Sequence, residues 1–270
     1  MPRDQSGASG KRSRASTPDS ARKRLLECLS QRSSWNGLEL FEWFVDDLLA
    51  RWGAPGFAAR MPDGTQAALK AAIAAYQDAI TLHEPFYDLL GPVIMDLRST
   101  GTKSRLGSFY TPWHLARCMA TMSMGGSPTA RTDEIRLMRA TDPCLGSGVM
   151  MLALACEICL QHGPASLRQW SFSGCDIDRL ACRAAAVQFL ANCSVHNLPV
   201  GEVLVLCGNS LIDDEDKEVI VHATAPGVAP DVAPDDCARA IVRFATSDPR
   251  FPQQRDQLSL FDVGDGLVSR

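Results

Sequence analysis

The sequence has no apolar run long enough to cross a membrane, which takes about 20 residues. Its N-terminal stretch is polar and basic, without the apolar segment of a secretory signal peptide. Its ten cysteines are scattered mostly through apolar segments. In a reducing compartment such cysteines act as small hydrophobic residues. We therefore expect a cytoplasmic protein with no membrane association.

Clustered metal ligands and a basic charge balance are also missing. The five histidines form no spaced group. Cys156 and Cys159 have the spacing of a metal-binding pair, but they lie in an apolar helical pattern without a second pair. Buried thiols are the favoured interpretation, and we expect no metal site. The net charge is −4, so contact with nucleic acid must use a local patch instead of a global basic field.

Length and composition indicate an α/β protein with a helical lead-in. The chain has 270 residues, 46% of them hydrophobic, which is ample for a sizeable core. Residues 1–20 are predicted to be a disordered basic tail, and 21–99 carry apolar residues at helical spacing. Residues 100–251 form the expected α/β domain, with a linker or long loop at 222–236. Residues 252–270 are expected to be a flexible C-terminal tail.

The α/β domain is organised around a glycine-containing turn between a short strand and a helix. Residues 140–148 read Ala-Thr-Asp-Pro-Cys-Leu-Gly-Ser-Gly, and an apolar run follows at 149–155. Glycine accepts φ > 0 and lets a ligand approach the backbone, while the helix start offers unpaired N–H groups. An ordinary tight turn is the alternative. The candidate binding residues here are Asp142, Pro143, Gly146, Ser147 and Gly148.

Two better-known phosphate-binding patterns are absent from this turn. Met151 stands where the third glycine of a dinucleotide fingerprint belongs. No Gly-Lys-Ser/Thr follows, so the turn is not a P-loop. These absences disfavour an NAD-type oxidoreductase and leave the type of ligand open at this point.

Two further strand–loop units follow the turn. Residues 170–175 and 202–207 have the composition of buried strands. The first leads to Asp176, where an acceptor-only carboxylate can bind ribose hydroxyls. The second leads to Asn209 and Ser210, and an Asn there can hold an adenine edge. Three strands with polar groups at their carboxyl ends fit a cofactor crevice in an open sheet.

The order of these motifs resembles a known family. Upstream, residues 107–112 read Gly-Ser-Phe-Tyr-Thr-Pro. This element, followed by Asp-Pro-x-x-Gly-Ser-Gly, Gly-x-Asp-Ile-Asp and Gly-Asn-Ser-Leu, resembles the N6-adenine DNA methyltransferases. The most similar group is that of the type I restriction modification subunits and their phage and plasmid relatives. The Asp-Leu-Leu-Gly of residues 88–91 resembles the lead-in of that group, and the match covers roughly residues 85–211.

The resemblance implies a class I S-adenosylmethionine-dependent methyltransferase fold, a Rossmann-like α/β sheet that is partial here, with an N-terminal helical region. It implies S-adenosylmethionine as cofactor, DNA as partner and the N6 amine of adenine as methyl acceptor. In the family the Phe/Tyr-Thr-Pro element closes over the methionine end of the cofactor; packing of the aromatics in the core is the alternative. The corresponding residues here are Phe109, Tyr110, Thr111 and Pro112.

The catalytic motif of that family is not intact in this sequence. An Asn/Asp/Ser-Pro-Pro-aromatic motif should follow a fourth strand, where its polar side chain accepts from the adenine amine and its ring stacks on the flipped base. The nearest candidate is Asp248, Pro249 and Phe251, after a strand expected at 240–245. Arg250 replaces the second proline and brings a positive charge near a cationic methyl donor. A chance Asp-Pro turn is the alternative.

The expected sheet is also short for a complete enzyme. A class I methyltransferase sheet has seven strands, of which this sequence predicts four, and no target-recognition domain is evident. Either a second methyltransferase or specificity subunit completes the enzyme, or the chain is a non-catalytic S-adenosylmethionine-binding, DNA-associated protein tethered to the sliding clamp.

The tether is suggested by a short C-terminal motif. Residues 257–261 read Gln-Leu-Ser-Leu-Phe, which resembles the pentapeptide by which bacterial replication and repair proteins dock on the DNA sliding clamp. Leu260 and Phe261 are adjacent apolar anchors, Leu258 adds a third contact, and Gln257 can donate and accept hydrogen bonds. The alternative is a terminal strand that packs back on the domain.

Overall fold

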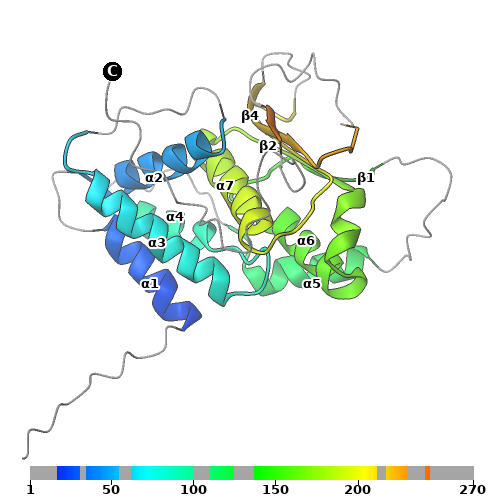
Figure 1. The fold of residues 1–270 in the computed structure, drawn as a ribbon, viewed down its shortest axis with the longest axis horizontal. Helices are drawn as coiled ribbons and strands as arrows, with labels where there is room; N and C mark the ends of the chain where they lie inside the picture. Colours follow the sequence, from blue (N-terminus) through cyan, green and yellow to red (C-terminus); the bar gives the residue numbers. More distant parts are fainter. Residues whose placement is uncertain are drawn as a thin grey trace, which may run out of the picture.

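Four of the described helices form an N-terminal layer that precedes α5 and the sheet (Figure 1). Thr17 and Asn36 cap the first two in capping boxes, each satisfying backbone N–H groups of the first turn. The helices are α1 (Pro18–Leu29), α2 (Gly37–Arg51), α3 (Gln66–Leu82) and α4 (Leu90–Ser99). The computed structural model describes residues 17–30, 35–54, 62–99, 110–124, 137–211, 217–229 and 241–243.

One boundary predicted from sequence is wrong at this end. Helix α1 begins at Pro18, a residue type favoured in the first helical turn. The last residues of the segment predicted to be a disordered tail, 18–20, are therefore helical.

Three parallel strands form the part of the sheet that the sequence predicted. Strands β1 (Met138–Asp142), β2 (Trp170–Asp176) and β3 (Glu202–Cys207) pair in that order. Helix α6 (Val149–His162) and the short 3-10 helix η1 (Pro164–Gln169) connect β1 to β2. Helix α7 (Arg179–Val195) connects β2 to β3. The strands predicted at 170–175 and 202–207 are confirmed.

The sheet continues differently from expectation beyond β3. Strand β4 (Glu218–Thr224) runs antiparallel to β3, and β5 (Ile241–Arg243) runs parallel to β4. The sheet order is β1-β2-β3-β4-β5, five strands instead of the expected four. The predicted linker at 222–236 is wrong at its start, because residues 222–224 belong to β4.

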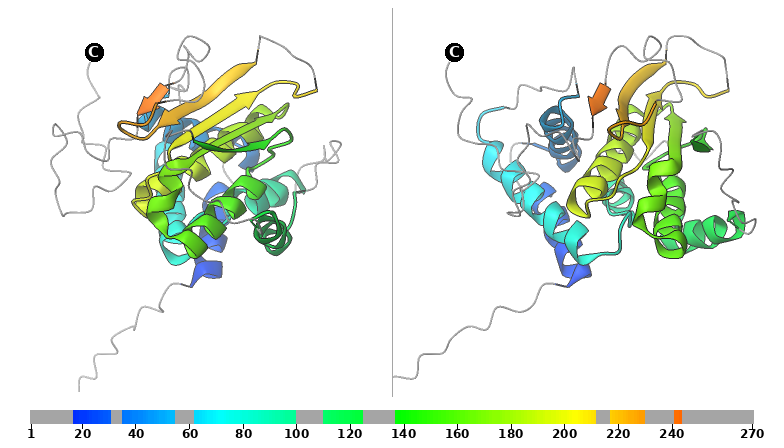
Figure 2. Two further views of the ribbon diagram at one scale, coloured as in Figure 1. Left: turned by 90° about the vertical axis from the view of Figure 1, so that its right-hand side faces the viewer. Right: turned by 45° about the vertical axis from the view of Figure 1, so that its right-hand side comes forward.

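The described helices lie on one side of this sheet (Figure 2). Crossovers between parallel strands are nearly always right-handed, so two in the same direction place α6 and α7 on the same face. The N-terminal helices pack on α7 from the side opposite the sheet, so α7 lies between the two layers (Figure 1).

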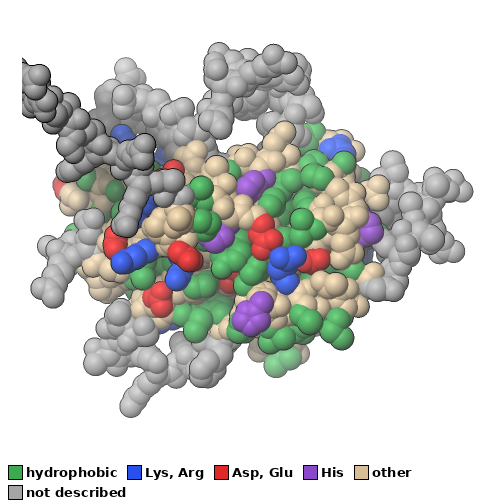
Figure 3. All heavy atoms as spheres, turned by 90° about the horizontal axis from the view of Figure 1, so that it is seen from below, with side chains coloured by type: hydrophobic (Ala, Val, Ile, Leu, Met, Phe, Trp, Pro, Cys, Tyr) green, Lys and Arg blue, Asp and Glu red, His purple; other side chains and the backbone are tan. Residues whose placement is uncertain are grey.

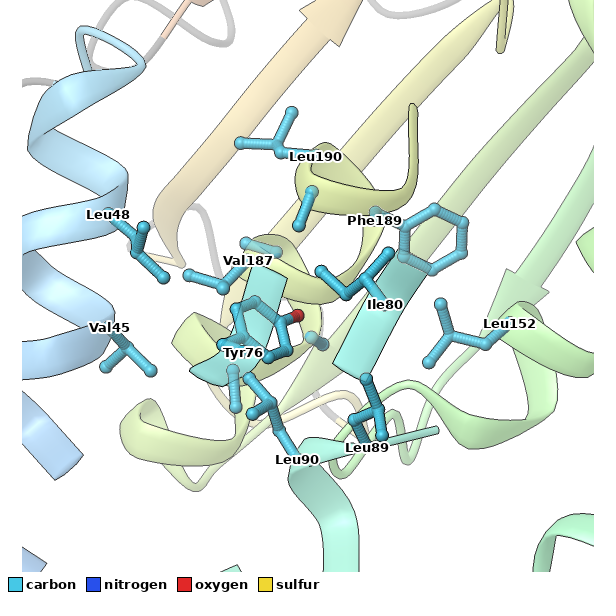
Figure 4. Packing of buried hydrophobic residues seen from close by; sticks show 14 of the residues in the cluster. Val45, Leu48, Tyr76, Ile80, Leu89, Leu90, Leu152, Val187, Phe189 and Leu190 are labelled. Atoms are coloured by element: carbon cyan, nitrogen blue, oxygen red, sulfur yellow. The ribbon is translucent and has the colours of Figure 1, made fainter. Parts of the chain in front are cut away.

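Helix α7 is consequently the centre of the core. Its residues 180–193 are all buried. Figure 4 shows Val187 and Phe189 of α7 among side chains from α2 and α3, including Leu48 and Tyr76. The described part of the chain contains no helix with the length and apolarity needed to span a bilayer.

Strand β1 lies at one edge of the described sheet. Among the described residues, β1 pairs only with β2, and exposed and half-buried residues alternate along it. Helix α5 (Trp113–Ser123) packs on α6 near this edge. Of the described strands, the one that leads into the glycine turn is therefore the outermost.

Candidate functional site

The loop that follows β1, residues 142–148, requires glycine at two positions and is called the cofactor loop below. Gly146 has φ +53° and Gly148 has φ +89°, both in the left-handed region that disfavours other residues. A Cβ on Gly146 would lie 3.2 Å from the ring of Tyr110, and one on Gly148 would lie 3.1 Å from Cβ of Ala185. Gly148 is also the N-cap of α6, so the turn and the helix start are built together.

Asp176 joins the cofactor loop to the end of β2. One carboxylate oxygen accepts from the Gly146 backbone N–H at 2.8 Å. The other accepts from the Asp178 backbone N–H at 2.9 Å. Each oxygen has two lone pairs, so each retains room for a further donor. The loop is also held by the Leu145 N–H, which donates to the Cys175 carbonyl at 3.0 Å.

A cavity of about 310 Å³ lies beside this junction. It brings together residues from the ends of β1 and β2 and from the segment before α5. The predicted site residues that line it are Tyr110, Thr111, Asp142, Gly146 and Asp176.

The cavity is acidic. Asp142, Asp176 and Asp178 all line it. Burial raises the pKa of Asp142, and the nearby charge of Asp176 raises it further against a hydrogen bond from the Cys144 N–H. A cation in the cavity would offset this repulsion. Burial also raises the pKa of Tyr110 to about 12, so its phenol stays neutral.

Sequence reasoning missed Asp178, which lines this cavity, and its ion-pair partner Arg98. Asp178 caps α7 by accepting from the N–H groups of Leu180 and Ala181 at 3.1 and 3.3 Å. Its other oxygen pairs with Arg98 of α4. An aspartate directly before a helical run is a cap signal, which would have identified Asp178. No local pattern indicates that Arg98, 80 residues earlier, reaches it.

Several predicted residues do not line the cavity. Asn209 is exposed, and its side chain accepts from the Leu211 N–H in a local turn at 2.9 Å. Ser147 is fully buried and faces Asp88 instead. The other predicted cofactor-binding residues that are described but do not line the cavity are Pro112, Pro143, Gly148 and Ser210. The predicted residues that lie outside the described part of the chain are Phe109, Asp248, Pro249, Phe251, Gln257, Leu258, Leu260 and Phe261.

The direction of β5 bears on the candidate catalytic motif. Strand β4 is antiparallel to β3, and β5 is parallel to β4. The carboxyl end of β5 therefore points in the direction opposite to the carboxyl ends of β1, β2 and β3, where the cofactor loop lies. Four strand spacings, roughly 19 Å, also separate β5 from β1. The strand before Asp248 therefore leads away from the cavity.

A second, larger cavity of about 490 Å³ runs along the open edge of β1. It shares Asp142 and Met150 with the acidic cavity, and its lining is otherwise mostly apolar. The remaining lining comes from α5 and its C-cap, from β1 and α6, and from the first residue of β2: Ala120, Ser123, Met124, Arg139, Ala140, Thr141, Met151, Leu154 and Trp170.

Comparison with known proteins identifies the family. A protein-family model described as N-6 DNA Methylase matches residues 88–228, just over half of the chain. The chain belongs to the N-6 DNA methylase family. The resemblance inferred from the motifs is thereby confirmed, and membership implies S-adenosylmethionine as the cofactor. The matched region includes the cofactor loop, Asp176 and the whole of β4.

The other comparisons are more distant. No curated protein matches the chain. One similar solved structure, lmo1582 from Listeria monocytogenes, is described as a class I S-adenosylmethionine-dependent methyltransferase. The identity is 13% and the TM-score 0.42, over 73% of this chain. The chain spans 55% of the length of that structure.

The glycine geometry gives a first prediction for this N-6 DNA methylase family member. Gly148→Ala is expected to destabilise the protein by about 1–2 kcal/mol for the left-handed backbone, and by more because of the contact with Ala185. It is also expected to weaken cofactor binding at least tenfold. Urea unfolding and calorimetry with S-adenosylmethionine measure the two effects.

Gly53→Ala is the matched control. Gly53 has φ +76° after α2, and a Cβ there would meet nothing within 4 Å. It should cost stability without changing cofactor affinity. Equal effects of the two substitutions on affinity would contradict a specific role for the cofactor loop.

Proposed function

We propose that the chain binds S-adenosylmethionine in the acidic cavity and is the cofactor-binding part of a DNA methyltransferase acting on the N6 amine of adenine. The observation that carries the proposal is the hydrogen bond between Asp176 and Gly146, which joins two strand ends beside the cavity. Ligand crevices of open α/β sheets lie at the carboxyl ends of the strands. Family membership supports the class of reaction.

The residues fit this cofactor in charge and in hydrogen bonding. S-adenosylmethionine carries positive charge on its sulfonium and ammonium groups, and it supplies the methyl group for transfer. The carboxylates of Asp142, Asp176 and Asp178 line the cavity, and one of them is already paired with Arg98. The free lone pairs of Asp176 can accept from ribose hydroxyls. Tyr110, against Gly146, can present its ring to the sulfonium.

The proposed ribose contact can be tested by substitution of Asp176. Asp176→Ala should weaken S-adenosylmethionine binding by roughly 1.5–3 kcal/mol, about 10- to 150-fold, the range for hydrogen bonds to a charged group. Asp78→Ala, which removes an exposed carboxylate paired with Arg24, is the control. Calorimetry that detects no cofactor binding by the folded wild-type chain would refute the proposal.

The charges on the face in Figure 3 bear on where DNA could bind. On this face, most of the described Lys and Arg side chains lie next to Asp or Glu. Arg22 and Arg24 are close in the sequence, but each is paired with a carboxylate. Arg22 lies 3.6 Å from Asp96, and Arg24 lies 3.1 Å from Asp78. This face presents no continuous basic patch among the described residues.

We further infer that a second polypeptide, of the methyltransferase or specificity subunit type, completes the enzyme at the open edge of β1. The apolar cavity runs along this edge, where no described strand other than β2 pairs with β1, and the edge strand of a sheet can accept an added strand. Leu115, Met119 and Met122 form a separate apolar strip on another face of α5, where they are 47%, 45% and 77% exposed. The altered motif at Asp248, Pro249 and Phe251 and the direction of β5 favour dependence on such a partner. They equally favour the second candidate, a non-catalytic cofactor-binding protein.

Methyl transfer distinguishes these candidates. We expect weak or no transfer of a tritiated methyl group to mixed-sequence DNA by the pure chain, and stimulation by host lysate. Met119→Glu with Met122→Glu should remove the stimulation and leave cofactor affinity unchanged. Robust transfer by the pure chain, lost in Asp248→Ala, would instead establish Asp248 as catalytic. No transfer under any condition would support the non-catalytic candidate.

The C-terminal motif gives a separate prediction about location on DNA. We propose that Gln257, Leu258, Leu260 and Phe261 dock the chain on the DNA sliding clamp, which would raise its local concentration at DNA. Fluorescence anisotropy of the labelled full chain with a purified bacterial clamp should show saturable binding. Leu260→Ala with Phe261→Ala should abolish it. Binding that is absent, or unchanged in the double variant, rules the docking out.

A further inference from the structure

The segment that joins α3 to α4 is held by polar side chains of α7. The Asn192 side-chain oxygen accepts from the Phe86 N–H at 2.6 Å. The Gln188 side-chain oxygen accepts from the N–H groups of Leu89 and Leu90 at 2.8 and 3.0 Å. Both amide side chains are buried, where an unpaired polar group is costly. The N-terminal helices are therefore attached to α7 by specific bonds as well as by apolar packing.

The same Gln188 also holds the cofactor loop. Its side-chain nitrogen donates to the Ser147 carbonyl at 3.0 Å and to Asp88 Oδ1 at 2.8 Å. A glutamine amide has two N–H donors and an oxygen with two lone pairs, so all four are used. One buried side chain thus connects the lead-in to α4 with the cofactor loop.

Asp88 completes this junction from the other side. It accepts from the Gly91 N–H at 3.0 Å, and the Ser147 hydroxyl lies 3.4 and 3.5 Å from its two oxygens. A Cβ on Gly91 would lie 2.4 Å from Asp88 Oδ2 and 2.7 Å from Ser147 Oγ. Only glycine fits there. The Asp-Leu-Leu-Gly motif therefore packs directly beneath the cofactor loop.

We propose that Gln188 and Asp88 are positioning residues through which the N-terminal helices set the conformation of the cofactor loop, and hence the affinity of the site for S-adenosylmethionine. The part about affinity rests on the proposed function. The part about the loop does not, since it concerns only bonds within the chain.

The burial of Asp88 gives the junction a pH dependence. Burial raises the pKa of Asp88 to about 6 from an ordinary 3.8, against hydrogen bonds from Gln188, Gly91 and Ser147. Tyr76, Tyr87 and Tyr110 sense its charge, and their own raised pKa values keep them neutral at this pH. Between about pH 4 and pH 6 the folded protein keeps the proton on Asp88, while the unfolded chain releases it. The free energy of unfolding therefore falls as the pH rises through this range.

Asp88→Asn should remove this fall in the free energy of unfolding between about pH 4 and pH 6.

Gln188→Glu is the sharpest variant for testing the proposal. It keeps the oxygen that accepts from Leu89 and Leu90, but it loses both donors and places a carboxylate against Asp88. Hydrogen exchange of the Leu145, Gly146 and Gly148 amides, which are hydrogen-bonded in the loop, should become at least tenfold faster in the cofactor-free protein. Gln161→Glu, which likewise removes a donor to a carboxylate, is the matched control and should leave these amides unchanged.

The double variant Asp88→Asn with Gln188→Glu separates positioning from stability. It restores a donor–acceptor pair between positions 88 and 188 with the roles exchanged, but not the donor to the Ser147 carbonyl. We expect the melting temperature to recover while loop exchange stays fast and cofactor affinity stays at least tenfold weak. Recovery of loop protection together with stability would overturn the proposal.

The remaining outcomes are also decisive. Wild-type loop exchange in folded Gln188→Glu would overturn the proposal directly. If that variant does not fold, Asp88→Asn alone must speed loop exchange while the α3 amides stay protected, and unchanged loop exchange refutes the positioning role. A wild-type protein that fails to bind S-adenosylmethionine would refute the proposed function, and the exchange data would still decide the proposal about the loop.

Discussion

Helix α7 is covered on both sides, and this burial determines much of the structure. The sheet packs on one side and the N-terminal helices on the other, so its polar side chains must find partners inside the protein. Arg183 pairs with Asp46 of α2 at 2.6 Å, while Gln188 and Asn192 bond the segment before α4. These bonds specify how the helical layer docks on the α/β layer. The cofactor loop rests against the same helix, through Gly148 and the Ser147 carbonyl.

As a consequence, both the α/β layer and the N-terminal helical layer contribute residues at the proposed site. Asp142, Gly146 and Asp176 come from strand ends of the α/β layer, while Arg98 comes from α4 of the helical layer and reaches Asp178. The open edge of β1 adjoins this site through the apolar cavity. In the described part of the chain, the proposed cofactor site therefore lies beside a sheet edge to which no further described strand is paired.

The elements that sequence predicted well are those with local causes. Glycines at 146 and 148 and an acid at 176 are visible in the sequence, and the buried strands around them are short apolar runs. The elements that it missed depend on distant partners. Strand β4 was missed because Asp and Glu precede it and its register is set by pairing with β3. Gln188 lies in an Ala-rich helix, and its role depends on contacts with Leu89, a residue 99 positions earlier in the chain.

The claim that the carboxyl ends of β1 and β2 form the cofactor site is tested most directly by nuclear magnetic resonance. Titration of the isotope-labelled chain with S-adenosylhomocysteine, the product form of the cofactor, should shift the amide signals of Tyr110, Gly146 and Asp178 first and most strongly. Signals of the exposed face of α3 should stay unchanged. Absence of any shift at saturating ligand, or shifts confined to residues outside the acidic cavity, would contradict the account.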